Sequence, residues 1–197
     1  MIDKKEDIFN SAKELFYAKG YKDINVADIA KMAGIGVGTF YNYYSSKEQL
    51  FLEIFMKENE KQKKSMAESF NLNDDDPVML VTKVVTQNIT AMNANPILKE
   101  WNNKDIVSKL EQCFYEQGGI ESINEFFQSS TAELIKKWKA EGKIRGDLDD
   151  ELILAICNSV HYVDIHKRDI GIHHFPQVIH YLTEFIMKGL TDCRKKE

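Results

Sequence analysis

Apolar residues recur at spacings of three and four positions along almost the whole of this chain. This spacing places them on one face of an α-helix, and the strict alternation that marks a half-buried strand is rare. Only three prolines, Pro77, Pro96 and Pro176, occur among the 197 residues. The pattern therefore predicts an all-α fold of about nine helices.

The composition, 43% hydrophobic and 29% charged, is that of a soluble globular protein. Its strictly apolar runs, such as residues 152–157, are far shorter than the roughly 20 residues that cross a bilayer. The first ten residues alternate in charge and lack the apolar stretch of a secretory signal. Cys113, Cys157 and Cys193 are widely separated and form neither a CxxC pair nor a disulfide framework. We therefore expect a protein of the reducing cytoplasm.

The net charge of −5 is unevenly distributed. Residues 1–64 carry 11 basic against 10 acidic side chains, a net charge of +1, and the other 133 residues carry 15 against 21, a net charge of −6. The N-terminal third is the less acidic part but is not a basic patch, so charge alone neither indicates nor excludes a nucleic-acid partner.

Capping signals divide residues 8–50 into short helices. The first helix ends at Lys19-Gly20, and a second follows Asn25, which is a good N-cap with Asp28 three residues later. Gly34 ends that helix, a third covers residues 37–43, and a fourth begins within "SSKEQL", where either Ser45 or Ser46 fits a capping box.

An acidic, turn-rich stretch at residues 71–77 separates these helices from the rest, and Asp76-Pro77 is expected to cap and open the next helix. Further helices are predicted over residues 77–93, 96–116 (broken near residues 102–105), 119–141, 149–168 and 175–192. We expect one domain over residues 1–48 and a second over residues 49–197, with the helix at 49–70 linking them.

The stretch "GIGVG" at residues 34–38 superficially resembles a phosphate-binding loop. Such loops follow a β-strand, whereas a capped amphipathic helix precedes this one, so a nucleotide fold is disfavoured. A helix-turn-helix explains the glycines better. Gly34 lies in the turn, Gly36 begins the second helix, and Gly38 lets the backbone approach a phosphate closely.

Four aromatic residues follow within residues 40–44. Phe40 and Tyr44 lie four apart and are expected to face the core. The other positions face outward, and we expect the hydroxyls of Tyr41 and Tyr43 to contact phosphates. The outward positions are Val37, Thr39, Tyr41, Asn42 and Tyr43.

Residues 8–51 resemble the DNA-binding domain of the tetracycline-repressor (TetR) family. The resemblance is carried by "AKELF" with "KGY", by "VADIAKMAG", by "GTFYNYY" and by "SKEQLF". It implies an all-helical homodimer that binds a pseudo-palindromic operator. It further implies a repressor released from double-stranded DNA by a small-molecule effector, which binds the C-terminal domain.

The resemblance also implies roles for individual residues. The backbone phosphates would be contacted by Asn25, Thr39, Tyr41, Tyr43 and Lys47, and the groove by Val37 and Asn42. Residues 1–50 contain no arginine, so the bidentate contact of arginine to guanine is absent. We therefore expect an A·T-rich operator, read by Val37 on a thymine methyl group and by amide or hydroxyl contacts.

The last two predicted helices are the expected dimer surface, by resemblance and by pattern, although intramolecular packing would give the same pattern. Ala155 and Ser159 are small residues four apart that allow close helix approach. A stripe on the last helix contains Val178, Leu182, Phe185 and Gly189.

Effector-binding residues are harder to choose from the sequence. A polar line with Asn158 and His161 interrupts an apolar helix, and it either points into a pocket or pairs across the dimer. Aromatic residues would line an apolar cavity or fill an ordinary core. The candidate ligand residues are Trp101, Phe114, Phe127, Asn158, His161 and Tyr162.

Two other functions compete with that of an effector-controlled repressor: an enzyme, and a DNA-binding regulator that docks a protein partner. None of the five histidines has a second histidine four residues away, and His161 with Cys157 alone is a weak pair, so we expect neither a metal nor another cofactor. No nucleophile–base motif is present, which disfavours an enzyme. A DNA-binding regulator whose C-terminal domain docks a protein partner stays open as an alternative.

Overall fold

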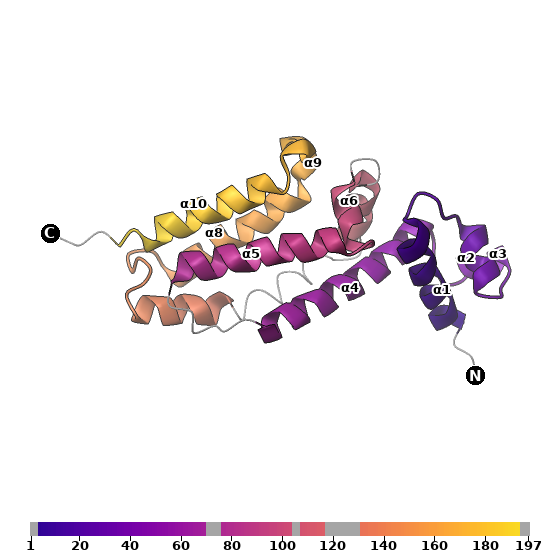
Figure 1. Cartoon of the computed structure of the whole chain (residues 1–197), viewed down its shortest axis with the longest axis horizontal. Coiled ribbons are helices and arrows are strands. Elements are labelled where there is room, and N and C mark those ends of the chain that lie inside the picture. The colour runs from indigo at the N-terminus through magenta and orange to yellow at the C-terminus, as the bar shows by residue number, and fades with distance from the viewer. Residues whose placement is uncertain (1–3, 70–75, 104–106, 117–130, 194–197) are drawn as a thin grey trace. The chain divides into compact units, whose positions relative to one another are not determined.

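The protein was analysed as a computed structural model that describes residues 4–69, 76–103, 107–116 and 131–193 (Figure 1). All regular elements in these ranges are helical, which confirms the predicted all-α class. The chain divides into two compact units. Unit 1 comprises Met1–Glu68 and Ala91–Glu116, and unit 2 comprises Ser69–Thr90 and Gln117–Glu197.

Unit 1 contains the predicted N-terminal helices. They are α1 (Lys4–Lys19), α2 (Val26–Met32), α3 (Val37–Tyr41) and α4 (Lys47–Ser69), followed by a 3₁₀ turn, η1 (Leu98–Asn102), and α6 (Val107–Glu116). Helix α1 ends before Gly20, whose φ of 78° is the left-handed conformation expected of a C-terminal glycine. Packing thus places most of α4 in the same unit as α1–α3, while the functional boundary predicted after residue 48 stays a prediction.

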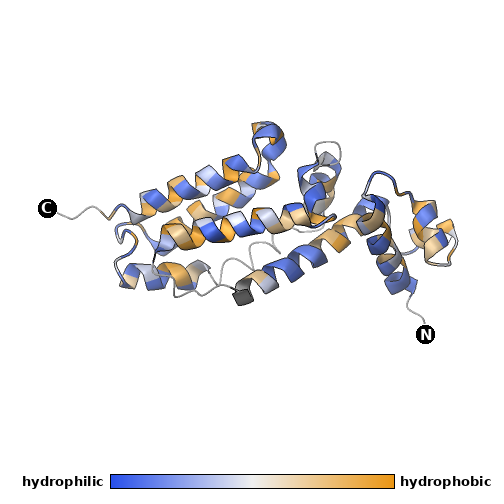
Figure 2. Cartoon of the chain, viewed as in Figure 1, coloured by the Kyte–Doolittle hydropathy of each residue, from blue (hydrophilic) through white to orange (hydrophobic). Residues whose placement is uncertain are grey.

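Aromatic side chains join α1 to α4 in the core of unit 1. The ring of Phe51 lies edge-on to Phe16, at 5.1 Å between centroids, and to Tyr21, at 4.9 Å. These geometries are favourable for buried aromatic pairs. Figure 2 shows a hydrophobic stretch near the start of α4, after its polar first turn, and a hydrophilic middle. The first part buries Phe51 and its neighbours, so it holds the N-terminal helices together.

Unit 2 is built from α5 (Pro77–Ala94, whose last four residues belong to unit 1), a helix over residues 131–140, α8 (Asp150–Ile165) and α10 (Gln177–Thr191). The carboxylate of Asp76 accepts hydrogen bonds from the backbone N–H groups of Val78, at 2.8 Å, and Met79, at 3.1 Å. The predicted start of this helix at Asp76-Pro77 is therefore confirmed.

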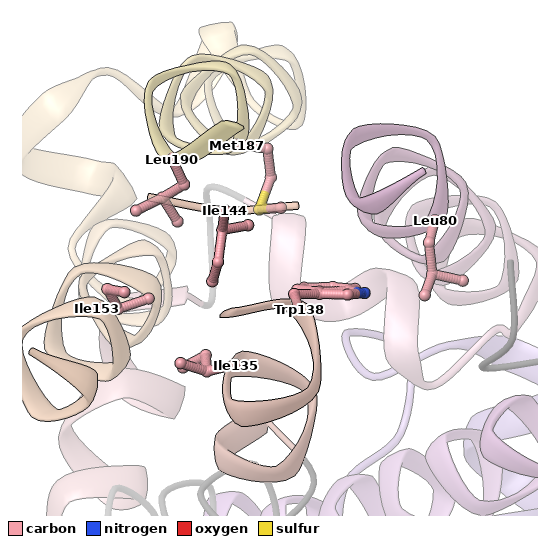
Figure 3. Close-up of a cluster of buried hydrophobic side chains, with 7 residues drawn as sticks. All are labelled: Leu80, Ile135, Trp138, Ile144, Ile153, Met187 and Leu190. Atoms are coloured by element: carbon pink, nitrogen blue, oxygen red, sulfur yellow. The ribbon is translucent and has the colours of Figure 1, made fainter. Parts of the chain in front are cut away.

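One cluster of buried side chains joins these helices (Figure 3). Its members are Leu80, Ile135, Trp138, Ile144, Ile153, Met187 and Leu190. The backbone N–H of Arg145 donates to the carbonyl of Leu190 at 2.8 Å, which fixes the loop carrying Ile144 to the end of α10. Burial of this apolar surface is the main source of stability for unit 2.

The helix predicted over residues 149–168 is wrong at its C-terminal end. Helix α8 stops at Ile165, and a short α9 (Lys167–Ile170) and a 3₁₀ turn η2 (Ile172–His174) follow. Lys167 is fully buried, and its ammonium lies 3.2 Å from the carboxylate of Asp164. A buried charge needs a partner, and Asp164 supplies one from only three residues away. The burial of Lys167 itself is the feature that the helical pattern does not reveal. The predicted break at Gly171 is confirmed by its φ of 127°.

Candidate nucleic-acid interface

Helices α2 and α3 form a helix-turn-helix within unit 1, as the sequence predicts (Figure 1). The side chain of Asn25 accepts a hydrogen bond from the backbone N–H of Asp28 at 3.0 Å, and the Asp28 carboxylate accepts one from the Asn25 N–H at 2.9 Å. This reciprocal capping box fixes the start of α2. Gly34 then takes a φ of 67°, a left-handed conformation that favours glycine, and turns the chain toward α3.

The aromatic residues of α3 and its C-terminal flank divide into buried and exposed sets. Phe40 and Tyr44 are buried, with ring centroids 5.9 Å apart, so the predicted anchors are confirmed. Val37, Tyr41 and Tyr43 are 42%, 55% and 41% exposed. Unit 1 therefore holds α3 rigidly by one face and presents apolar and phenolic side chains on the other.

The remaining predicted contact residues have less uniform surroundings. Asn42 is exposed and Thr39 is half-buried. Asn25 is exposed, but its amide oxygen is already engaged as the cap of α2. Gly38 lies in α3, and a Cβ atom placed there would meet nothing within 4 Å. Whether these residues touch DNA stays a prediction.

Lys47 has an internal structural role that the sequence did not suggest. Its ammonium donates hydrogen bonds to the carbonyl oxygens of Ile24, at 2.7 Å, and Tyr21, at 3.0 Å, and lies 3.9 Å from the centroid of the Tyr21 ring. Burial lowers the pKa of this half-buried lysine. Lys47 thus connects the first residue of α4 to the segment before α2. An ammonium group has three N–H donors, so these two hydrogen bonds leave one donor for another partner.

The start of α4 is also held by its own polar residues. The hydroxyl of Ser46 accepts a hydrogen bond from the N–H of Gln49 at 3.1 Å, which makes Ser46 the N-cap. The Gln49 side chain in turn accepts from the N–H of Ser45 at 2.7 Å. Of the two capping boxes that the sequence allows, the one starting at Ser46 is therefore formed. The side chain of Gln49 bonds back to the N–H of Ser45, one residue before the N-cap, and not to the N–H of Ser46.

A partly buried polar contact connects the start of α4 to α6. The hydroxyl of Tyr21 donates to the carboxylate of Glu48 at 2.8 Å, and the ammonium of Lys109 lies 3.6 Å from the same oxygen. Burial, together with the neighbouring Glu48 carboxylate, raises the pKa of Tyr21, which therefore stays a neutral donor. These partners are 27 and 61 residues apart, so no local pattern predicts them.

A sequence model described as "Bacterial regulatory proteins, tetR family" matches residues 8–54, the segment that forms this helix-turn-helix. Over 54 residues the chain is 43% identical to the uncharacterized HTH-type transcriptional regulator YhgD of Bacillus subtilis (strain 168). Residues 8–54 are therefore a TetR-family helix-turn-helix segment. The match to YhgD spans 27% of this chain and 28% of the length of the Bacillus protein.

Two further comparisons extend beyond the helix-turn-helix. The chain is 22% identical over 156 residues to the HTH-type transcriptional repressor AcnR of Corynebacterium jeikeium (strain K411), covering 78% of this chain and 75% of that protein. The crystal structure of RolR in complex with resorcinol matches with a TM-score of 0.64 at 14% identity, covering 97% of this chain and 88% of that one. The latter likeness shows a shared fold.

The predicted ligand residues do not gather in one described cavity. Trp101 is buried in unit 1, where its ring stacks on Phe55 at 5.3 Å. Asn158 and His161 are half-buried in α8 of unit 2, and Tyr162 is exposed there. The side chain of Phe114 and the whole of Phe127 lie outside the described residues.

The predicted dimer residues lie on the outer side of α8 and α10, which pack against each other in unit 2. Ala155, Ser159 and Gly189 are exposed and Phe185 is 64% exposed, while Val178 and Leu182 are half-buried. A shallow hollow lined by residues of η2 and α10 continues this surface. It is lined by His173, His174, Gln177, Val178, Tyr181, Leu182 and Phe185.

Metal ligands and membrane-spanning helices were sought among the described residues. In the ranges given above, no group of three or more His, Cys, Asp and Glu side chains is arranged to hold a metal ion. Within the same ranges, no helix has the length and apolar character needed to span a membrane.

Proposed function

We propose that this TetR-family chain is a transcriptional repressor, not an enzyme, and that it acts in the cytoplasm. In this proposal it binds a pseudo-palindromic DNA operator as a homodimer, and a small-molecule effector releases it. The observation that supports DNA binding best is the division of the aromatic residues around α3. Phe40 and Tyr44 anchor the helix, while Val37, Tyr41 and Tyr43 face solvent.

The contacts are assigned by side-chain chemistry. Hydroxyl and amide groups donate well to phosphate oxygens, and positively charged groups add a salt-dependent attraction. Lys47 would contribute its remaining N–H donor while keeping its bonds to Ile24 and Tyr21. We assign phosphate or backbone contacts to Asn25, Gly38, Thr39, Tyr41, Tyr43 and Lys47, and groove contacts to Val37 and Asn42.

We assign the exposed face of α8 and α10 to a second copy of the chain. A pseudo-palindrome presents half-sites about 34–36 Å apart, so each needs its own recognition helix. In a two-fold symmetric dimer, both subunits use the same surface for the contact, and each subunit contributes one recognition helix. Large exposed side chains such as Phe185 and Tyr181 are typical of such contacts, and Ala155, Ser159 and Gly189 leave room for close helix approach.

The effector is assigned to unit 2. RolR, which shares the fold, was crystallised in complex with resorcinol as its ligand. AcnR is named as a repressor, which supports repression over activation. Asn158 and His161 are half-buried polar groups among the apolar residues of α8, so we assign to them the polar contacts to the effector. In the alternative proposal, the C-terminal domain binds a protein partner instead of a small-molecule effector.

The DNA-binding part is tested by selecting sequences from a random pool of duplex DNA with the full chain. We expect an inverted-repeat sequence bound with a steep salt dependence. Failure to enrich any sequence at low salt would refute the proposal.

The effector part is tested by adding fractionated cell extract to the DNA complex. Release by the protein-free small-molecule fraction supports an effector. Release only by the protein fraction would establish the protein-docking alternative.

A further inference from the structure

Two glycines flank Val37 at the start of α3, and nothing in the part of the fold that the structure describes requires a glycine at either position. Gly36 has a φ of −78° and a ψ of 151°, a conformation that any residue adopts. A Cβ atom on Gly38 would meet nothing within 4 Å, and one on Gly36 would only reach the Thr39 hydroxyl at 4.0 Å. Gly34 differs, because its φ of 67° makes any other residue strained.

Neither glycine is the most stabilising residue for its position. A glycine within a helix, such as Gly38, is less favourable than alanine, and Gly36 supplies no side-chain hydrogen bond as the N-cap of α3. A sequence selected for stability alone would place a capping residue and a helix former at these positions. A partner outside the chain that approaches the backbone on both sides of Val37 would explain why neither position carries a side chain.

Val37 limits what that partner can be. Its side chain is exposed, and it has no hydrogen-bonding group. On the edge of a base pair in the major groove, the feature that an aliphatic side chain contacts is the C5-methyl group of thymine. The first arginine of the chain is Arg145, in unit 2, so unit 1 has no arginine for a bidentate contact to guanine.

We propose that Gly36, Val37 and Gly38 form a methyl-reading surface that determines operator specificity. In each half-site one thymine methyl group packs on Val37, and the two glycines let the base edges reach van der Waals contact with the backbone beside it. This inference rests on the proposed DNA-binding function and deepens it by naming the base feature that is read.

The first test replaces thymine by uracil, one position at a time, in the DNA sequence selected by the full chain. Loss of one methyl contact should weaken binding roughly 4-fold per half-site, the factor expected for one buried methyl group. The same replacement should have no effect on Val37→Ala, whose side chain no longer reaches the methyl group. If no thymine is sensitive to the replacement, or if Val37→Ala keeps the same sensitivity, the inference is overturned.

The second test uses Gly36→Ala and Gly38→Ala. Gly38→Ala should unfold at a temperature no lower than the wild type, because alanine is the better helix former, and Gly36→Ala should stay folded with a small loss of stability, because alanine caps a helix less well than glycine. Both variants should bind the selected DNA about 10-fold or more weakly, because the added methyl group keeps the base edge away from the backbone beside Val37. Gly146→Ala is the matched control in unit 2, since a Cβ atom there also meets nothing within 4 Å.

These outcomes separate the two proposals. If no DNA sequence is enriched at all, the proposed function fails. If a sequence is enriched but Gly36→Ala and Gly38→Ala both bind it as tightly as the wild type, only the methyl-reading surface fails.

Discussion

The hydroxyl of Tyr17 lies 2.6 Å from the carboxylate of Glu58 and joins α1 to α4 within unit 1. Glu58 is buried, and it also contacts the ammonium of Lys13 at 2.7 Å and accepts a hydrogen bond from the amide of Asn95 at 3.2 Å. Burial by itself would raise the pKa of Glu58, but the hydrogen bonds from Lys13, Tyr17 and Asn95 outweigh it and lower the pKa. Three segments distant in sequence therefore meet at one ionised carboxylate.

Tyr17→Phe should reduce the free energy of unfolding. It removes a hydrogen bond to a charged group, and since the Tyr17 residue is 38% exposed we expect about 1–2 kcal/mol, the lower part of the range for such bonds. Urea unfolding measures the change. Tyr162→Phe, at an exposed position in unit 2, is the control and should leave the midpoint unchanged. An unchanged midpoint for Tyr17→Phe would show that the contact is not stabilising.

The same contact predicts an alkaline loss of stability. Burial, and then the Glu58 carboxylate, raise the pKa of Tyr17 from 10.0 to about 12. Because the folded state holds this proton more tightly than the unfolded state, the contribution is complete below pH 10 and is lost as the pH rises to about 12. The wild type should therefore lose more stability over this interval than Tyr17→Phe. Parallel pH profiles for the two proteins would contradict the assignment.

Lys47→Met should destabilise the protein without any DNA present. It leaves the carbonyl oxygens of Ile24 and Tyr21 without this donor, which costs about 1–3 kcal/mol. Differential scanning calorimetry of the free protein measures the effect. Lys31→Met, at an exposed lysine of α2, serves as the control. If Lys47 acted only on phosphate, the free protein would unfold at the wild-type temperature.

Phe185→Glu should dissociate the proposed dimer while each protomer stays folded. The side chain is 64% exposed in the single chain, so the glutamate meets water there, but in a dimer it would be buried opposite its symmetry-related copy. Sedimentation velocity reports the oligomeric state, and circular dichroism reports the fold. Met79→Glu, at a residue 71% exposed on α5, is the matched control. A wild-type protein that sediments as a monomer at micromolar concentration refutes the dimer itself.

Tyr41→Phe and Tyr43→Phe should each weaken DNA binding several-fold, as expected for one hydrogen bond to a charged phosphate. Both rings are exposed, so the thermal stability should not change. Affinity for the selected DNA is measured by fluorescence anisotropy at one fixed salt concentration. The phosphate contacts would be disproved if both variants bound with wild-type affinity.

Local patterns predicted the helix-turn-helix well, because its determinants lie within a few residues of one another. The capping box of Asn25 and Asp28 spans three residues, Gly34 acts through its own backbone, and Phe40 and Tyr44 share a face four residues apart. Each of these is a consequence of helix periodicity or of a single dihedral angle, and both can be read directly from the order of residues.

The tertiary structure alone decided which polar groups meet. Lys47 reaches Ile24 across 23 residues, Asn95 reaches Glu58 across 37, and Lys167 is buried where the helical pattern predicted an uninterrupted helix. A lysine, an asparagine or a glutamate is compatible with either solvent or a buried partner, and the free energy that selects between them comes from segments brought together by folding. The sequence therefore determined the helices and the exposed face of α3, and the packing of unit 1 determined how rigidly that face is held.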